Sequence, residues 1–226
     1  MVVSHQIIAP AILTTNENDE YEGGNQLMVN ATLIAITPDA EAVIESCGRV
    51  CYDSEMGSSR DFVQRLIRSG HESVIEHACA SFEIECSRAC SHQLVRHRIA
   101  SYSQRSQRYV RENEPDYILP PSVSERGGEA LSTFEEAMRA AWAAYSKLLR
   151  LGVKPQDARF VLPNACQTRI RVTMNFRSWR HFIRERGLNP AAQWEIRAIA
   201  RQVLAILALE APSCFSDLLE QAQRGG

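Results

Sequence analysis

Residues 93–109 hold the densest group of side chains able to bind an anion. The segment has four arginines and no acid: Arg96, Arg98, Arg105 and Arg108. Between them stand an imidazole, three hydroxyls and three amides: His97, Ser101, Ser103, Ser106, Gln93, Gln104 and Gln107. Forked guanidinium donors suit phosphate oxygens, and hydroxyls and amides suit the edges of a base. The segment therefore predicts a site for an anionic, nucleotide-like ligand.

A run of basic residues is also typical of a solvated helix face or of a patch that contacts RNA. A basic RNA- or nucleotide-binding module without catalysis is therefore a second hypothesis. It predicts nucleic-acid binding that weakens with salt, and no bound flavin. The formal net charge of −2 and the lack of an RNA-binding signature argue against it.

The same segment contains a specific motif. Arg96-His97-Arg98 is followed by seven residues and then by Ser106-Gln107-Arg108-Tyr109. Further blocks flank it in order: Gly70-His71-Glu72-Ser73-x-x-Glu76-His77, Ala158-Arg159-Phe160-Val161-Leu162-Pro163, Asn175-Phe176-Arg177-Ser178 and, after Arg186, Gln193-Trp194-Glu195. On these residues the sequence resembles the flavin-dependent thymidylate synthases, over roughly residues 30–218.

The resemblance implies an activity: reductive methylation of dUMP to dTMP, with methylenetetrahydrofolate as carbon donor and FAD reduced by NADPH. It also implies a homotetramer whose active sites are shared between subunits, in an α+β fold with a small antiparallel sheet packed by helices. The expected partners are these small molecules, with no nucleic acid, no membrane and no metal. The expected location is the cytoplasm.

The resemblance also assigns residues to dUMP. Arg186 resembles the arginine that activates the uracil, where a permanent cation stabilises negative charge developing on the ring. The rest of the implied dUMP set is Gln93, Leu94, Val95, Arg96, Gln104, Arg105, Ser106, Gln107, Arg108 and Arg159. Arg108 and Arg159 are the expected phosphate clamps. Ser106 is assigned to binding rather than to nucleophilic attack, because the sequence identifies no base to activate it.

A second implied set would contact the flavin, where imidazole and guanidinium groups can stack on the ring or pair with the diphosphate. Its members are His71, Ser73, Glu76, Arg96, His97, Arg98, Ile99, Gln104, Asn175, Arg177 and His181.

The sequence departs from the family pattern at three places. The loop Gly187–Ala192 has no histidine, and Gln104 and Gln156 stand where the family can carry Glu. These changes remove possible acid–base groups. A third hypothesis is therefore a degenerate member that binds FAD and dUMP but turns over slowly.

Composition fits one globular domain, with 226 residues of which 45% are hydrophobic and 23% charged. No apolar run is long enough for a membrane span, and no secretion signal is seen. The seven cysteines form no zinc-type spacing, and Cys86 and Cys90 would need two further ligands to hold a metal. Residues 1–27, polar and rich in Asn and Glu around 14–26, are interpreted as a disordered extension ahead of a domain over 28–226.

Periodicity indicates the elements of that domain. In the first half of the chain we expect helices from Thr37-Pro38 through Cys47, from Ser59 to a stop at Gly70, and over 87–98. In the second half we expect a helix from a capping box at Ser132 to Leu151, one that starts near Arg177, and one over 192–209. Alternating residues predict strands over 80–86 and 168–174, and Pro and Gly predict a loop over 111–129.

Overall fold

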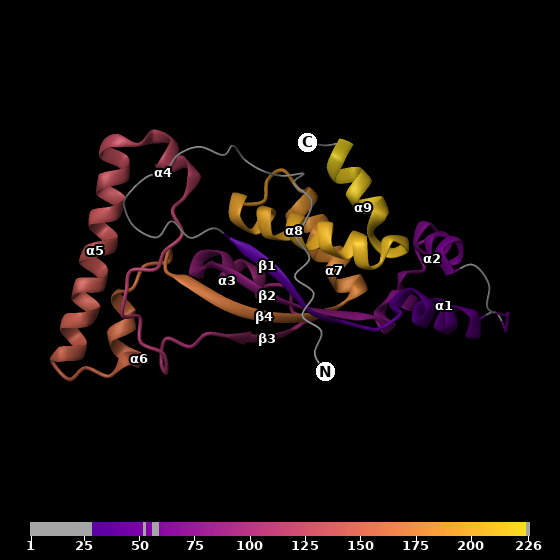
Figure 1. Cartoon of the computed structure of the whole chain (residues 1–226), viewed down its shortest axis with the longest axis horizontal. Helices are drawn as coiled ribbons and strands as arrows, with labels where there is room; N and C mark the ends of the chain where they lie inside the picture. The colour runs from indigo at the N-terminus through magenta and orange to yellow at the C-terminus, as the bar shows by residue number, and fades with distance from the viewer. Residues whose placement is uncertain (1–28, 52, 56–58, 225–226) are drawn as a thin grey trace.

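The computed structural model describes residues 29–51, 53–55 and 59–224, with side chains from residue 61 onward in the last range. The extension predicted for residues 1–27 lies outside these residues. The described part is an α+β fold in which one small sheet is packed by helices (Figure 1). Among the described residues, no helix is both long and apolar enough to cross a bilayer.

The sheet has four antiparallel strands in the order β1-β2-β4-β3. Their bounds are β1 Asn30–Ile36, β2 Cys79–Ser87, β3 Ser101–Gln104 and β4 Gln167–Asn175. The central strands β2 and β4 pair along their whole length, from Cys79 opposite Asn175 to Ser87 opposite Gln167. Alternation along both strands turns one face inward, with Phe82, Ile84, Ile170 and Val172 buried.

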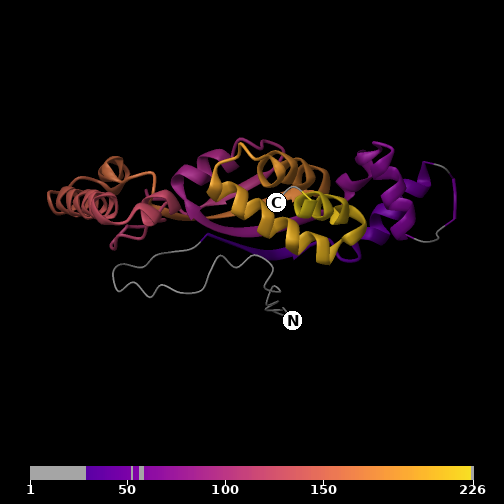
Figure 2. The ribbon, with the colours of Figure 1, turned by 90° about the horizontal axis from the view of Figure 1, so that it is seen from above.

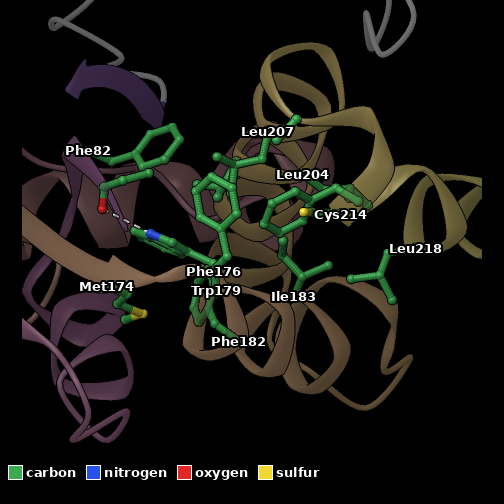
Figure 3. Close-up of a cluster of buried hydrophobic side chains, with 14 of the residues drawn as sticks. Phe82, Met174, Phe176, Trp179, Phe182, Ile183, Leu204, Leu207, Cys214 and Leu218 are labelled. Atoms are coloured by element: carbon green, nitrogen blue, oxygen red, sulfur yellow. Dashed lines mark hydrogen bonds between the residues drawn. The ribbon is translucent and has the colours of Figure 1, made fainter. Parts of the chain in front are cut away.

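Helices cover that apolar face. They are α3 Arg88–Leu94, α7 Phe176–Phe182 and α8 Trp194–Glu210, with α9 Pro212–Arg224 packed on α8. The helices α1 Ala40–Val50 and α2 Ser59–Arg68 pack on each other at one end of the sheet, and α2 also contacts α9. Trp179 lies at the centre of the packing, edge-on to Phe82 at 5.1 Å between ring centroids. Its indole nitrogen donates to the carbonyl of Ala80 at 3.0 Å, which satisfies the buried polar group (Figure 3).

The opposite face of the sheet is polar. Glu83 on β2 pairs with Arg171 on β4 at 2.9 Å, and Ser81 bonds Thr173 at 2.7 Å. None of the helices named above packs on these side chains, because the apolar residues that anchor a helix point the other way.

A second, smaller apolar cluster lies at one end of the molecule, around Met138, Trp142 and Cys166. Its residues come from α5 Gly128–Arg150 and from the segments around Tyr117 and Leu162–Cys166. The short helices α4 Pro121–Arg126, α6 Pro155–Ala158 and η2 Arg159–Val161 pack against α5. Both views show these helices beyond one end of the sheet, with α1 and α2 at the other (Figures 1 and 2).

Most predicted elements are confirmed. The strands expected over 80–86 and 168–174 are β2 and β4, and the helices near Arg177 and over 192–209 are α7 and α8. Gly70 follows α2 with a φ of 79°, as expected for a helix stop.

Four predictions of element limits are wrong. Pro38 lies in a turn, and the first helix begins at Ala40 after Asp39 takes a left-handed φ of 47°. The helix expected over 87–98 ends at Leu94. The loop expected over 111–129 contains α4 and the start of α5. Ser132 is therefore not a cap: it lies one turn inside α5, and its hydroxyl bonds the carbonyl of Glu129 at 3.1 Å.

Besides α4, seven elements were not predicted. They are β1, β3, α6, α9, η2, the 3₁₀ helix η1 Glu72–His77 and the π-helix η3 Ile183–Leu188. Two of these elements, η1 and η3, carry residues of the expected flavin and dUMP sets.

Candidate active site

Strand β4 sets the spacing of the candidate site residues. Gln167 at its start and Asn175 at its end are about 26 Å apart, at roughly 3.3 Å per residue. Strand β3 runs antiparallel beside it, with Ser101 opposite Thr173 and Gln104 opposite Ile170. The residues that follow β3 therefore lie toward the start of β4, and Arg177 lies beyond its end.

The segment Gln104–Arg108, here called the nucleotide loop, is fixed at the start of β4. Gln104 donates to the hydroxyls of Ser91 at 2.9 Å and Thr168 at 3.2 Å. The backbone N–H of Arg105 bonds the carbonyl of Arg169 at 2.9 Å. These bonds continue the strand pairing past β3 and hold the loop in one place.

Side chains of the nucleotide loop are anchored as well. Arg105 pairs with the buried carboxylate of Glu112 at 2.8 Å, and its carbonyl accepts from Arg88 at 3.0 Å. Gln107 is buried and donates to the sulfur of Cys166 at 3.3 Å. Arg105 and Gln107 therefore shape the loop more than they reach out of it.

Two guanidiniums near this loop remain available for an anion. Arg108 is exposed and lies over the ring of Tyr109, 5.3 Å from its centroid. Arg159 donates to the carbonyl of Gln156 at 3.1 Å. Neither makes an ion pair within the described part of the chain. Each guanidinium can therefore bind an anion without first breaking a salt bridge.

The nucleotide loop and Arg159 form the first group of candidate site residues, and a second group surrounds Arg186 in the π-helix η3. Its Nε donates to Nε2 of His97 at 3.2 Å, and His97 also contacts His181 and Phe182, with ring centroids 5.7 and 5.1 Å away. Burial, together with the nearby Arg186 and the neighbouring His181, lowers the pKa of His97 to about 4. His97 is thus a neutral acceptor at physiological pH, and the guanidinium keeps its charge.

The third group lies at the end of β4. Asn175 caps α7 by accepting from the N–H of Ser178 at 2.8 Å. Arg177 in the first turn of α7 pairs with Glu76 in η1 at 2.6 Å, so two members of the expected flavin set touch. His71 immediately precedes η1 and Ser73 lies within it, and both are exposed.

The turn after α3 exposes three residues of the flavin set together: Arg96, Arg98 and Ile99. Ile99 is 76% exposed, and neither arginine forms an ion pair in the described structure. Tyr102 holds this turn because its hydroxyl lies 2.9 and 2.7 Å from the carbonyls of Leu94 and His97.

Two members of the expected dUMP set, Leu94 and Gln107, are buried. The side chain of Leu94 is fully buried, so only its backbone could meet a ligand. Gln93 lies 3.5 Å from Gln193, which caps α8. Sequence reasoning did not identify the supporting residues Ser91, Glu112 and Thr168. Their contacts depend on tertiary structure, and nothing in the local sequence indicates them.

These groups lie apart within one chain. The nucleotide loop and Arg159 are at the start of β4, and Asn175 and Arg177 are at its end, with the Arg186–His97 pair beside the turn after α3. Two residues are expected in both ligand sets, and they also lie apart from each other: Gln104 is in the nucleotide loop, and Arg96 is in the turn after α3.

Comparison with known proteins shows the family. The family model described as thymidylate synthase complementing protein matches residues 32–213. A flavin-dependent thymidylate synthase of Geobacter sulfurreducens is 46% identical over 82% of this chain and 84% of its own. The chain belongs to this family of flavin-dependent thymidylate synthases. Another of that name, from Mycolicibacterium gilvum, is 41% identical over 84% of this chain and 88% of its own.

Solved structures show the same fold. A crystal structure of the UMP/dUMP methylase PolB from Streptomyces cacaoi, bound with 5-Br dUMP, superposes with a TM-score of 0.75 at 23% identity. It covers 83% of this chain and 93% of that one. A second structure of that enzyme, bound with 5-Br UMP, gives a TM-score of 0.76 at 24% identity, over 86% and 95% of the two chains.

Proposed function

We propose that this protein is a flavin-dependent thymidylate synthase that methylates dUMP reductively to dTMP. Methylenetetrahydrofolate is the carbon donor, and NADPH reduces the FAD. The observation that carries the proposal is the family match over residues 32–213, because it includes every residue of the three groups described above.

In this proposal the nucleotide loop and Arg159 bind the dUMP phosphate. The two unpaired guanidiniums of Arg108 and Arg159 supply forked, charged donors. Ser106 serves in binding: its hydroxyl accepts the N–H of Arg108 at 3.2 Å, and no base contacts it within the described residues. A serine without such a base is a poor nucleophile.

Arg186 stabilises charge that develops on the uracil. Its guanidinium is positive at every physiological pH, and its bond to the neutral His97 leaves that charge uncompensated. A negative charge forming nearby is therefore attracted without competition from a carboxylate on the same arginine.

The residues expected to hold FAD fit an anionic, planar cofactor. Arg96 and Arg98 are exposed cations free of ion pairs in the described structure, and the neighbouring Ile99 is an exposed apolar surface. Arg96, Arg98 and Arg177 would meet the diphosphate, while Ile99, His97 and His181 would lie against the ring. When bound and reduced, FAD supplies the reducing equivalents for the methylation.

We also propose a homotetramer in which each active site combines residues of different subunits. The separation of about 26 Å along β4 supports this, because it lies between the residues proposed for dUMP at the start of the strand and those proposed for FAD at its end, whereas the reacting rings must meet. A second copy could bring the start of its β4 to the end of this one.

The purified protein tests the proposal through its flavin spectrum. We expect it to bind FAD, and the absorbance of the bound flavin to change on addition of dUMP but not of thymidine. Flavin binding and a dUMP response without turnover would favour the degenerate-member hypothesis. Absence of flavin binding, with salt-sensitive binding to RNA, would support the nucleic-acid hypothesis instead.

A further inference from the structure

Glu72 in η1 lies between two arginines that belong to consecutive helices. Its Oε1 is 2.7 Å from Nη2 of Arg184 in η3 and 3.4 Å from Nε of Arg180 in α7. Oε2 accepts a further bond from Arg184 at 3.4 Å. Burial would raise the pKa of Glu72, but Arg184 and Arg180 outweigh it and lower that pKa. The carboxylate is therefore charged at neutral pH and holds both cations.

Arg180 is a rigid partner because it is fully buried. Its guanidinium binds both carboxylate oxygens of Asp217 in α9, at 2.7 and 2.6 Å, and donates to the carbonyl of Cys214. A forked pair of this kind fixes the plane of the guanidinium. Glu72 is thus attached to the core formed by α7 and α9, and Arg184 is attached to Glu72.

The other end of η3 is also held. Gly187 packs so closely on α8 that an added Cβ would lie 3.3 Å from Cβ of Ala200, and its carbonyl accepts from Arg201 at 3.2 Å. A π-helix is rare and is most often found at functional sites. Here it is fixed at Arg184 and at Gly187, and Arg186 lies between these two points.

We propose that Glu72 is a positioning residue: by anchoring Arg184 it holds Arg186 against His97. Glu72 itself touches neither Arg186 nor His97. Its neighbours His71 and Ser73 are exposed and belong to the expected flavin set, so the same carboxylate links the flavin-side segment to the arginine on the uracil side. This inference rests on the proposed function only for what Arg186 does, not for where it lies.

The titration of His97 reports the position of Arg186 without any ligand or turnover. The charged groups that face His97 are Arg186, His181 and Glu185. If Arg186 moves away, the pKa of His97 rises from about 4 toward its ordinary 6.5, because a repelling cation has been lost. Labelled histidine in the full-length protein gives this pKa by NMR over roughly pH 8 to 3, a range that includes both values.

We expect Glu72→Gln and Arg184→Met to raise the pKa of His97, and Arg186→Met to show the size of the full effect. The matched control is Arg49→Met, which removes the 2.9 Å ion pair to the buried Glu45, at a distance from η3 along the chain. It should leave His97 unchanged. An unchanged His97 titration in both Glu72→Gln and Arg184→Met overturns the inference.

Kinetics of the FAD-loaded enzyme provide a second test of this role of Glu72. We expect Arg184→Met to lower kcat about tenfold, since a small displacement of a catalytic group is costly. On an Arg186→Met background the same change should cost nothing further, because both act through one group. Additive losses would contradict the inference. A wild-type chain that makes no dTMP would contradict the proposed function, and the His97 titration would still decide on Glu72.

Discussion

The Nε of Arg186 lies 3.2 Å from the Nε2 of His97, so a half-buried neutral imidazole accepts from a permanent cation. Arg186 comes from the π-helix after α7, and His97 from the turn after α3, 89 residues earlier. The pair joins the Arg-His-Arg motif to the residue proposed to act on uracil. Its consequence is a guanidinium that is positioned by a neutral group and keeps its full charge for the substrate.

Replacing Arg186 with alanine should lower kcat for dTMP formation by about 100- to 1,000-fold, the usual cost of removing a donor that stabilises developing charge. The exposed Arg150 in α5 is a suitable control, and Arg150→Ala should keep wild-type turnover. Turnover of Arg186→Ala near the wild-type value would mean that another group activates the uracil.

The phosphate clamps should affect affinity rather than rate. Arg108→Ala and Arg159→Ala each remove one charged donor, which should raise KM for dUMP about 10- to 100-fold with a small change in kcat. Affinity for deoxyuridine, which has no phosphate, should stay near the wild-type value. If a variant loses affinity for dUMP and for deoxyuridine equally, the arginine that was replaced does not bind the phosphate.

Shared active sites predict complementation between two impaired variants, measured at a dUMP concentration that saturates the wild type but not Arg108→Ala. Arg108→Ala damages the start of β4, and Arg177→Ala damages its end, where it removes the 2.6 Å pair to Glu76. If one site takes these residues from different subunits, co-expressed and doubly tagged mixtures should recover roughly a quarter of the sites. Mixtures that stay as slow as the separate variants would show that each chain completes its own site.

His97 predicts a pH dependence of stability. Its folded pKa of about 4 lies below the ordinary 6.5, so the unfolded chain binds more protons between these values. Its contribution to stability is present above about pH 6.5 and is lost as the pH falls toward about 4. Burial raises the pKa of Glu195, which acts with the opposite sign. His97→Gln should therefore weaken the loss of Tm in this window, whereas His92→Gln, at an exposed position, should not.

The sequence was sufficient for the elements with a strong apolar period. Strands β2 and β4 alternate cleanly, and their inward residues form the core, so both were predicted. Strand β3 was missed because its four residues Ser101–Gln104 are polar apart from Tyr102, and its structure depends on pairing with β4. The helix after Ser87 was predicted too long, since nothing local shows that Tyr102 binds the carbonyls of Leu94 and His97.

The candidate site also has features that the sequence predicts and features that it does not. The arginines were recognisable from their types and motif, and the family comparison confirms the family that the motif indicated. The ion pairs that hold them were not predictable, because Glu72 and Arg184 are 112 residues apart. The long helix α5 also begins earlier than Ser132 suggested, since Gly127 and Gly128 supply the positive φ angles that start it.

The most direct test of the proposed activity is dTMP formation by the purified protein under anaerobic conditions. The assay contains dUMP, methylenetetrahydrofolate, FAD and NADPH, and each is omitted in turn. We expect product only in the complete mixture, with loss of product when FAD or NADPH is absent. Product that persists without both FAD and NADPH, from protein freed of flavin, would contradict a flavin-dependent route.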